Sequence, residues 1–268
     1  MRERIAAIGE IAEDHYIDDG NRLLGGISAN FARAAASVGA RVTLFGAVGD
    51  DPRGTRLLER LRKSGLDAQV RVLPGRSACQ RIRVAKNGER VFCGFEAGVV
   101  VDYVLLGTEL EALAAYDAVA LPCSPESRLV FEQCMSELPP KVWRIADFSQ
   151  DTLAGDAEGW IEPHAERLRI AFVGGTRDFA EPLRALSKRV ETLVVLTAGA
   201  AGAFAFAAGE AYHQPSLART IVDTTGCGDA FQAAFTVRYL ESRTIADALH
   251  SGAALAARVA SRVGAAPD

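Results

Sequence analysis

Short apolar runs alternate with amphipathic helical stretches along this chain, and the alternation constrains the fold more than any other feature. Strands are predicted at Ile5–Ile8, Val42–Ala47, Ala118–Leu121, Trp143–Asp147, Ile170–Val173, Leu193–Thr197 and Ala203–Phe206. Helices are predicted at Ala29–Val38, Arg53–Ser64, Ser127–Met135, Asp178–Leu186, Ala230–Leu240 and Thr244–Val263. Such an order of elements forms a mostly parallel sheet with helices on both faces. No linker rich in Pro, Gly or Ser interrupts it, so we expect one α/β domain over residues 1–268.

One region breaks the alternation. Ala78–Val84 and Arg90–Phe95 are strand-like and flank Lys86-Asn87-Gly88, whose Asn-Gly pair is a strong hairpin signal. A hairpin inserted into a parallel-sheet protein has to lie outside the main sheet. The sequence therefore predicts a flap or an interface here, and a purely structural hairpin is the alternative.

Composition narrows the possible partners. The chain is 49% hydrophobic and 24% charged, as globular proteins are, and its net charge is −4 with 30 dispersed basic residues, so we expect no nucleic-acid partner. No apolar run approaches the ~20 residues of a membrane span, and Gly9 and Glu10 interrupt the first one, so we expect neither a signal peptide nor a membrane partner. The cysteines are odd in number and lack C-x-x-C spacing, which indicates reduced thiols in a cytoplasmic protein: Cys79, Cys93, Cys123, Cys134 and Cys227.

The most informative motif for function is Asp223-Thr224-Thr225-Gly226-Cys227-Gly228-Asp229-Ala230-Phe231. It follows the apolar residues Thr220-Ile221-Val222 and leads into a helical pattern, so it reads as a strand-to-helix turn. Glycines let the backbone approach a ligand, and the first N–H groups of a helix, with the positive end of its dipole, favour an anion. A carboxylate at this position, Asp229, can take a proton from a hydroxyl that attacks a phosphate. Ordinary helix capping is the alternative interpretation of an Asp beside glycines.

The whole string resembles the C-terminal signature of the ribokinase-like (PfkB) carbohydrate kinases, commonly D-T-x-G-A-G-D-x-F, with Cys227 in place of the Ala. The resemblance implies a doubly wound, mostly parallel sheet with helices on both faces and a small β lid formed by about residues 12–25 and 76–98. It implies transfer of phosphate from ATP, with Mg²⁺, to a sugar hydroxyl, and a homodimer formed through the lid. Asp229 would be the base, and the backbone N–H groups of Gly226, Cys227 and Gly228 would stabilise the transferring group.

The resemblance extends to a sugar-binding half. Gly25-Gly26-Ile27-Ser28-Ala29-Asn30 matches the family's Gly-Gly-x-x-x-Asn, and Gly9 to Asp14 keeps the spacing from the first strand to a sugar-binding carboxylate. By that match Asp14 and Asn30 bind sugar hydroxyls, and Gly25 and Gly26 let the backbone approach. Taken without the family, Asp14 is more often a solvated loop acid and Asn30 a cap. Gly49-Asp50-Asp51-Pro52-Arg53-Gly54 matches G-x-D-x-x-G, for which turn geometry is the favoured role.

A nucleotide-binding half is implied in the same way. Thr197-Ala198-Gly199-Ala200-Ala201-Gly202 matches the family's T-x-G-x-x-G beside the ATP phosphates, so Thr197, Gly199 and Gly202 would contact nucleotide. Ala253–Ala257 and the Gly264-Ala265 turn resemble the border of the adenine pocket. Asp223 and Thr225 match positions near a monovalent-cation site, which leaves a potassium requirement open.

The chain departs from the family at the N-x-x-E motif that organises magnesium. Gly174-Gly175-Thr176-Arg177-Asp178 stands there, with neither the Asn nor the Glu. Magnesium keeps several waters and binds chiefly ATP oxygens, so a shifted carboxylate can serve. Asp178 is the first candidate and Asp147 the second, while Arg177 is either a phosphate contact or a surface residue.

Within the family, the pattern is most similar to the fructoselysine 6-kinases. The similar stretches are Glu89-Arg90-Val91-Phe92, Glu96-Ala97-Gly98-Val99, Ala115-Tyr116-Asp117-Ala118-Val119 and Asp147-Phe148-Ser149. This similarity implies a fructosamine acceptor, whose amino end would meet a lid acid such as Glu96 by charge complementarity; an ordinary surface role for Glu96 is equally open.

Three rivals stay open at this point. The first is the same reaction on a ketose, a keto-deoxy sugar acid or a nucleoside; Tyr16 and Phe95 would suit a nucleoside, and Arg22, Arg81 and Arg83 a sugar acid. The second is a sugar or nucleotide sensor without catalysis, which the lost magnesium motif favours and Asp229 disfavours. The third is a nucleotide-binding oxidoreductase, disfavoured because no G-x-G-x-x-G follows the first strand.

Overall fold

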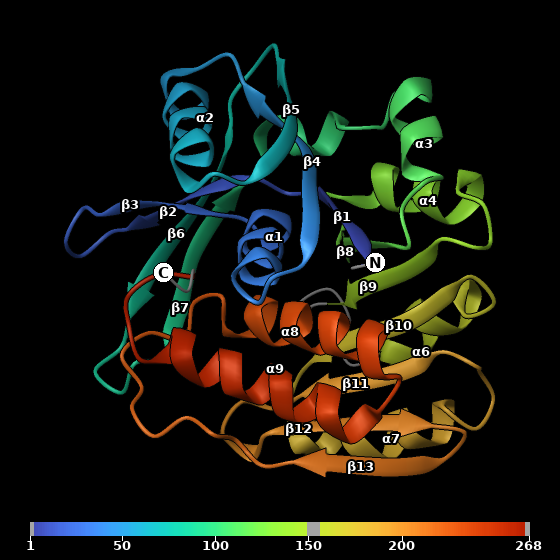
Figure 1. The fold of residues 1–268 in the computed structure, drawn as a ribbon. Coiled ribbons are helices and arrows are strands. Elements are labelled where there is room, and N and C mark those ends of the chain that lie inside the picture. Colours follow the sequence, from blue (N-terminus) through green and yellow to red (C-terminus); the bar gives the residue numbers. More distant parts are fainter. Residues whose placement is uncertain (1–2, 149–155, 266–268) are drawn as a thin grey trace.

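The strands of the protein form two separate sheets (Figure 1). We describe them from a computed structural model, in which residues 3–148 and 156–265 are placed. The large sheet has nine strands in the order β13-β12-β11-β10-β9-β8-β1-β4-β5, and the small sheet has four in the order β3-β2-β6-β7. In the large sheet the strands are β1 (Arg4–Gly9), β4 (Arg41–Gly49), β5 (Asp67–Leu73), β8 (Ala118–Cys123), β9 (Trp143–Phe148), β10 (Leu168–Gly174), β11 (Leu193–Thr197), β12 (Ala203–Ala207) and β13 (Glu210–Gln214). In the small sheet they are β2 (Ala12–Tyr16), β3 (Arg22–Gly25), β6 (Ala78–Val84) and β7 (Arg90–Glu96).

The large sheet is parallel from β5 to β11 and ends in two antiparallel strands, β12 and β13. Its inner parallel strands, β1, β4 and β8 to β11, are buried on both faces, which is why they read as continuous apolar runs. Helices connect the strands, and two more follow the last strand. The connecting helices are α1 (Ile27–Ser37), α2 (Pro52–Ser64), α3 (Gly107–Leu113), α4 (Arg128–Glu137), α6 (Ala157–Ile161) and α7 (Ala180–Leu186), and the two after β13 are α8 (Cys227–Ser242) and α9 (Ile245–Ala260). Short 3₁₀ turns are η1 (Gly98–Asp102), η2 (Glu162–His164), η3 (Arg177–Phe179) and η4 (Gly199–Ala201).

Helices cover both faces of the large sheet, each over its own hydrophobic core. Residues of α1, α2, α8 and α9 share one core with the strands, and residues of α3, α4, α6 and α7 share the other. In Figure 1 the red α8 and α9 lie side by side across the C-terminal half of the sheet, and α1 lies above them. The predicted mostly parallel sheet with helices on both faces is therefore confirmed.

The small sheet occupies the segments where the sequence places a lid. β2 pairs with β3 antiparallel and with β6 parallel, and β6 pairs with β7 antiparallel across the Asn87-Gly88 turn. Figure 1 shows this sheet beside α1 and above the C-terminal end of α9. Two segments that are far apart in the sequence are therefore joined into one sheet outside the main one.

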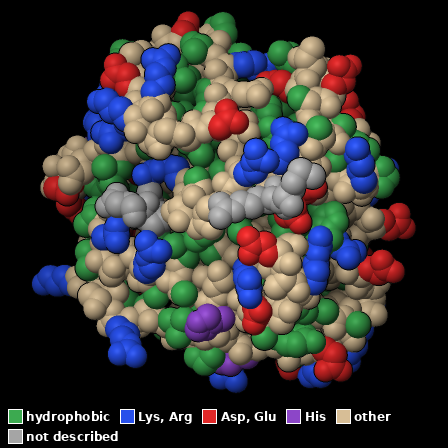
Figure 2. All heavy atoms as spheres, viewed as in Figure 1, with side chains coloured by type: hydrophobic (Ala, Val, Ile, Leu, Met, Phe, Trp, Pro, Cys, Tyr) green, Lys and Arg blue, Asp and Glu red, His purple; other side chains and the backbone are tan. Residues whose placement is uncertain are grey.

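On the face shown in Figure 2, lysine and arginine side chains are mixed with acidic ones over the whole surface. Within residues 3–148 and 156–265, no helix combines the length and the apolar character needed to cross a membrane.

Candidate functional site

The turn that begins α8 is built by a glycine in a left-handed conformation. Gly226 has a φ of 73°, and a Cβ placed on it would lie 2.3 Å from the Cβ of Ala265. Only glycine fits a position that is both left-handed and in close contact with another residue. Gly228 differs, because a Cβ there would meet no atom within 4 Å. The first turn of α8 therefore borders open space, although the N–H of Cys227 already donates to the Thr224 carbonyl at 3.3 Å.

The segment before this turn, residues 220–226, is irregular, and we call it the α8 loop. The predicted strand-to-helix turn is therefore wrong in its first half. Instead of pairing with a neighbouring strand, the backbone bonds to two other elements. The N–H of Val222 donates to the Ala260 carbonyl at 2.7 Å, at the end of α9, and that of Thr224 donates to the Gly88 carbonyl at 3.0 Å, in the β6–β7 turn. The loop is thus fixed by contacts with elements far away in the sequence.

Asp229 and Asn30 meet at the start of α8, although 199 residues separate them. The Nδ2 of Asn30, on α1, donates to Asp229 Oδ2 at 2.8 Å. Burial raises the pKa of Asp229 to about 6, while the Asn30 hydrogen bond and the Arg90 charge hold it down. The other amide atom, Asn30 Oδ1, is buried and has no partner within the described residues. Buried polar atoms normally have a partner, so this oxygen is available to accept from a ligand's donor.

Asp14 approaches the same place from β2, where Gly25 leaves room for it. A Cβ on Gly25 would lie 2.2 Å from the Asp14 carboxyl group, and a Cβ on Gly26, whose φ is 94°, would lie 2.7 Å from the Glu10 carbonyl oxygen. The Asp14 side chain is only 4% exposed. Burial and the negative charges of Asp229 and Asp223 raise the pKa of Asp14 to about 7.

The pKa values of two further carboxylates, Glu10 and Asp147, are raised by burial and by the negative charges of this cluster. Burial, opposed by the Ile27 N–H bond and reinforced by the charges of Asp229 and Asp14, raises the pKa of Glu10 to about 8. Burial and the charge of Asp229 raise the pKa of Asp147 to about 7. Sequence reasoning named Asp147 as a second metal candidate and missed Glu10, whose signal was its position directly after β1, at the edge where parallel strands end.

Asp223 joins three parts of the chain. Its carboxylate accepts from the Tyr16 hydroxyl at 2.6 Å, from the Thr225 N–H at 2.8 Å and from the Gly264 N–H at 2.9 Å. These donors come from the small sheet, the α8 loop and the C-terminal turn, and Asp223 is fully buried among them. The Oγ1 of Thr225 is buried without a partner among the described residues. The cation role of Asp223 and Thr225 stays a prediction.

Arg90 is a basic residue to which sequence reasoning gave no role. From the start of β7, its N–H donates to Thr224 Oγ1 at 3.0 Å and its guanidinium to the Thr224 carbonyl at 2.9 Å. The positive charge of Arg90 lowers the pKa values of Asp229, Asp14 and Asp147 together. The β6–β7 hairpin therefore brings a cation to the carboxylates while it holds the α8 loop.

Glu96 lies on the other face of the small sheet. Across the three strands β2, β6 and β7, one row of opposite residues is Asp14, Gln80 and Phe95. The neighbouring row is Glu13, Cys79 and Glu96. Residues directly opposite each other share a face, and neighbours along a strand alternate. Glu96 accordingly contacts Arg53 at 3.1 Å beside the buried Glu13. The structure does not bring Glu96 together with Asp14, so the predicted substrate contact is corrected to a position in this ion-pair network.

The predicted nucleotide residues follow strands of the large sheet or border the small one. Thr197 is the last residue of β11, and a Cβ on Gly199, whose φ is 53°, would meet no atom within 4 Å. Gly202 is required by the fold, because its Cβ would lie 2.2 Å from the Gln214 carbonyl oxygen. Gly264 has a φ of 89°, and its Cβ would lie 2.7 Å from the Leu23 side chain of β3.

Asp178, the first candidate for a magnesium ligand, belongs to no cluster of possible metal ligands among the described residues. Asp178 is exposed in η3, where its Oδ2 is 3.5 Å from the Thr176 hydroxyl. Among the residues that the structure places, no three His, Cys, Asp or Glu side chains converge as a ready-made metal cluster. Ser149, named with Asp147 and Phe148 in the sequence comparison, lies outside the described residues.

Comparisons with known proteins agree with this architecture. Residues 4–138 and 169–268 match the pfkB family carbohydrate kinases. The chain is 27% identical to fructoselysine 6-kinase of Escherichia coli (strain K12), over 95% of this chain and 96% of that protein. It is 24% identical to the fructosamine kinase FrlD of Bacillus subtilis (strain 168), over 98% and 92%. The crystal structure of adenosine kinase from Sinorhizobium meliloti superimposes with a TM-score of 0.85 at 20% identity, covering 100% of this chain and 96% of that one.

The fold is thus ribokinase-like. The chain belongs to the pfkB family of carbohydrate kinases and is itself a carbohydrate kinase.

Proposed function

We propose that this kinase transfers the γ-phosphoryl group of ATP to a hydroxyl of a sugar-amine conjugate of the fructosamine class. The observation that carries the reaction is the pair of Asp229 and Asn30 at the start of α8, beside the open space at Gly228. A carboxylate with a pKa of about 6 is ionised near neutral pH and still basic enough to accept a hydroxyl proton.

The other residues have supporting roles in this proposal. Asp14 and the unpartnered Asn30 Oδ1 hold sugar hydroxyls, and the sugar hydroxyl to be phosphorylated lies at Asp229. The first turn of α8 and the Arg90 guanidinium face the charge that develops on the transferring group. The small sheet closes over the sugar as a lid, and Thr197, Gly199 and Gly264 border the nucleotide.

Kinases of this family use ATP with a divalent metal, generally Mg²⁺. Mg²⁺ prefers oxygen ligands and keeps several waters. Asp147 is half-buried, and its pKa is raised by burial and by the charge of Asp229. Its carboxylate is therefore a ligand that fits such an ion. The metal supplies neutralisation of phosphate charge when it is bound. We infer that Asp147, rather than Asp178, would contribute to holding it.

The paired substitutions Asp147→Asn and Asp178→Asn test this inference. Asp147→Asn removes a carboxylate that interacts with Asp229, so it should raise the Mg²⁺ concentration for half-maximal activity by roughly tenfold or more. Asp178→Asn should have little effect, because Asp178 is exposed. Magnesium titrations of ADP release, at fixed ATP, measure both. Equal behaviour of the two variants would contradict the assignment.

The acceptor class rests on two considerations. Two relatives that span nearly the whole chain are named as kinases of fructoselysine and of fructosamines. Besides burial, repulsion between carboxylates also helps to raise the pKa values of Glu10 and Asp14, and a protonated amine on the acceptor would offset that repulsion. A nucleoside is the second candidate acceptor, because Phe95 shares the face of the small sheet that carries Asp14.

ADP release from MgATP, measured over fructoselysine, other fructosamines, free ketoses, sugar acids and nucleosides, tests the proposal. We expect turnover to be concentrated on fructosamines. Asp229→Asn should lower kcat by roughly 10²–10⁴-fold with ATP affinity largely kept, and Glu96→Gln is the matched control that should retain full activity. Turnover on another class would keep the reaction and reject the acceptor, while Asp229→Asn at wild-type rates would reject the base.

Homodimerisation through the small sheet and a potassium requirement are further parts of the proposal. Light scattering of the purified chain tests the first, and activity in potassium compared with choline salts tests the second. A monomer, or equal rates in the two salts, would remove the corresponding part.

A further inference from the structure

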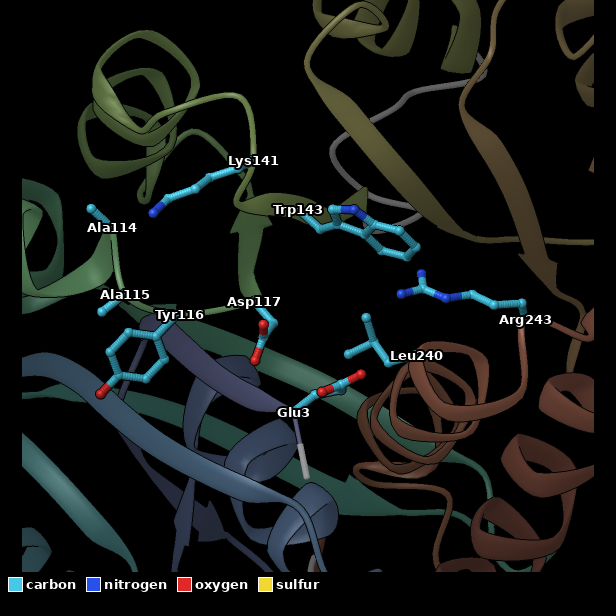
Figure 3. A pocket seen from close by; sticks show the side chains of 9 residues that line it. All are labelled: Glu3, Ala114, Ala115, Tyr116, Asp117, Lys141, Trp143, Leu240 and Arg243. Atoms are coloured by element: carbon cyan, nitrogen blue, oxygen red, sulfur yellow. The ribbon is translucent and has the colours of Figure 1, made fainter. Parts of the chain in front are cut away.

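A cavity lies at the edge of the large sheet away from Asp229. It has a volume of about 360 Å³, within the ~300–1,000 Å³ typical of small-molecule pockets. The residues Glu3, Asp117 and Trp143 that line it stand at the amino ends of β1, β8 and β9, and Arg243 follows the last residue of α8 (Figure 3). Proteins with such sheets bind their substrates at the carboxyl ends of the strands. Because this cavity lies at the amino ends, it is separate from the kinase site.

Charges of both signs line the cavity. Glu3 and Asp117 are acidic, Lys141 and Arg243 are basic, and Figure 3 shows their side chains arriving from four different segments. Within the described part of the chain none of the four forms an ion pair. One carboxylate oxygen of Asp117 accepts from the backbone N–H of Arg4 at 2.7 Å, which fixes its position. Figure 3 also shows the Lys141 amine and the Arg243 guanidinium on opposite sides of the cavity, with the two carboxylates between them. A small ligand with separated positive and negative groups would therefore meet the carboxylates with its positive group and one of the cations with its negative group.

An aromatic wall holds one of the cations in place. The Arg243 guanidinium carbon lies 4.0 Å from the centroid of the Trp143 ring, and Arg169 stacks on the same ring at 4.7 Å. Arg243 has a φ of 58°, a left-handed conformation that is uncommon for a residue with a Cβ, and its N–H ends α8 on the Tyr239 carbonyl. Stacking on Trp143 thus positions the guanidinium, and the Leu240 side chain adds an apolar surface.

We propose that this cavity binds a small zwitterionic amino acid with an apolar side chain. Its carboxylate lies at Arg243, its ammonium at Glu3 and Asp117, and its side chain against Leu240 and Trp143. A simple anion such as phosphate would meet the two carboxylates, and a simple amine would meet the two cations, so each single-charge ligand is disfavoured. The inference concerns a second site and does not depend on the identity of the kinase acceptor.

Tryptophan fluorescence tests the proposal, because the chain has only two tryptophans, Trp143 and Trp160. A Trp160→Phe variant leaves Trp143 as the reporter, and calorimetry on the unaltered chain gives a second readout. The probe is L-leucine. Its matched controls are 3-methylbutylamine, which lacks the carboxylate, and 4-methylpentanoate, which lacks the amine; inorganic phosphate is the anion control.

We expect saturable binding of L-leucine and at least tenfold weaker binding of each control. Arg243→Gln and Asp117→Asn should each weaken leucine binding by roughly tenfold, while Lys63→Gln, a change at an exposed lysine on α2, should leave it unchanged. Absence of saturation by both readouts, equal binding of a single-charge control, or unaltered binding in both cavity variants would overturn the proposal.

Discussion

At the scale of single residues, Asp229 combines the proposed role of catalytic base with a raised pKa. Its carboxylate must be ionised to accept a proton, so kcat/KM should rise as the pH increases through about 6 and level off above it. Asp14 and Asp147, with pKa values of about 7, are electrostatically linked to Asp229, so the acidic limb belongs to the group of carboxylates rather than to one member.

Arg90→Met should move this acidic limb to higher pH. The Arg90 charge lowers the pKa of all three carboxylates, so its removal lets each pKa rise. A kcat/KM profile from pH 5 to 9 at saturating MgATP measures the shift. Arg81→Met serves as the control, because Arg81 stands opposite Gly94 and shares the face of the small sheet that carries Glu13, not the one that carries Asp14. A limb that stays in place or moves to lower pH in Arg90→Met would contradict the expected electrostatics.

Gly25 permits a second residue-scale prediction. The added methyl group of Gly25→Ala would lie 2.2 Å from the Asp14 carboxyl group, which must move away. Overpacking of this kind costs ~1–3 kcal/mol, so we expect KM for the acceptor to rise by roughly tenfold or more while KM for ATP changes little. Gly107→Ala is the matched control, because a Cβ there meets no atom within 4 Å. An unchanged acceptor KM would show that Asp14 does not need this space.

At the scale of elements, the Tyr16 hydroxyl connects the small sheet to the α8 loop. Tyr16→Phe removes its 2.6 Å bond to buried Asp223, and loss of such a bond should lower the free energy of unfolding by about 1–3 kcal/mol. Urea denaturation measures this loss. Tyr212→Phe on β13 should be neutral, since Tyr212 is exposed and no hydrogen bond of its hydroxyl occurs within the described residues. Equal stabilities of the two variants would mean that the bond is weak in solution.

The strands that the sequence pattern revealed differ in burial from those that it did not reveal. Strands buried on both faces, such as β10 and β11, read as apolar runs and were predicted. The edge strands β5 and β13 carry exposed or half-buried side chains and lack such runs, so the pattern did not reveal them. The α8 loop was read as a strand from Thr220-Ile221-Val222, because the partners of its backbone, on α9 and on the β6–β7 turn, cannot be seen in a local pattern.

At the scale of the whole molecule, the site joins residues that only the fold brings together. The family motifs pointed to Asp14, Asn30 and Asp229, and the structure places Asn30 and Asp229 in direct contact. Glu96 was misplaced because its face depends on strand register, and β6–β7 contains an irregularity between Arg81 and Ile82. The register is set by how the strands pair in the folded protein, so it cannot be read from the hairpin sequence alone. For the same reason, the contact of Arg90 with Thr224 could not be predicted.

The N–H of Thr224 has a consequence for how motion in this kinase can be followed. It donates to the Gly88 carbonyl at 3.0 Å, across the boundary between the hairpin and the α8 loop. A hydrogen-bonded amide exchanges with deuterium only while its bond is open. Deuterium uptake at Thr224 should therefore slow at least several-fold when MgATP and acceptor are bound, whereas the Ala248 amide in α9 should be unaffected. Unchanged uptake would indicate that the hairpin stays in place throughout. The exchange of one backbone hydrogen thus measures how often the small sheet separates from the α8 loop.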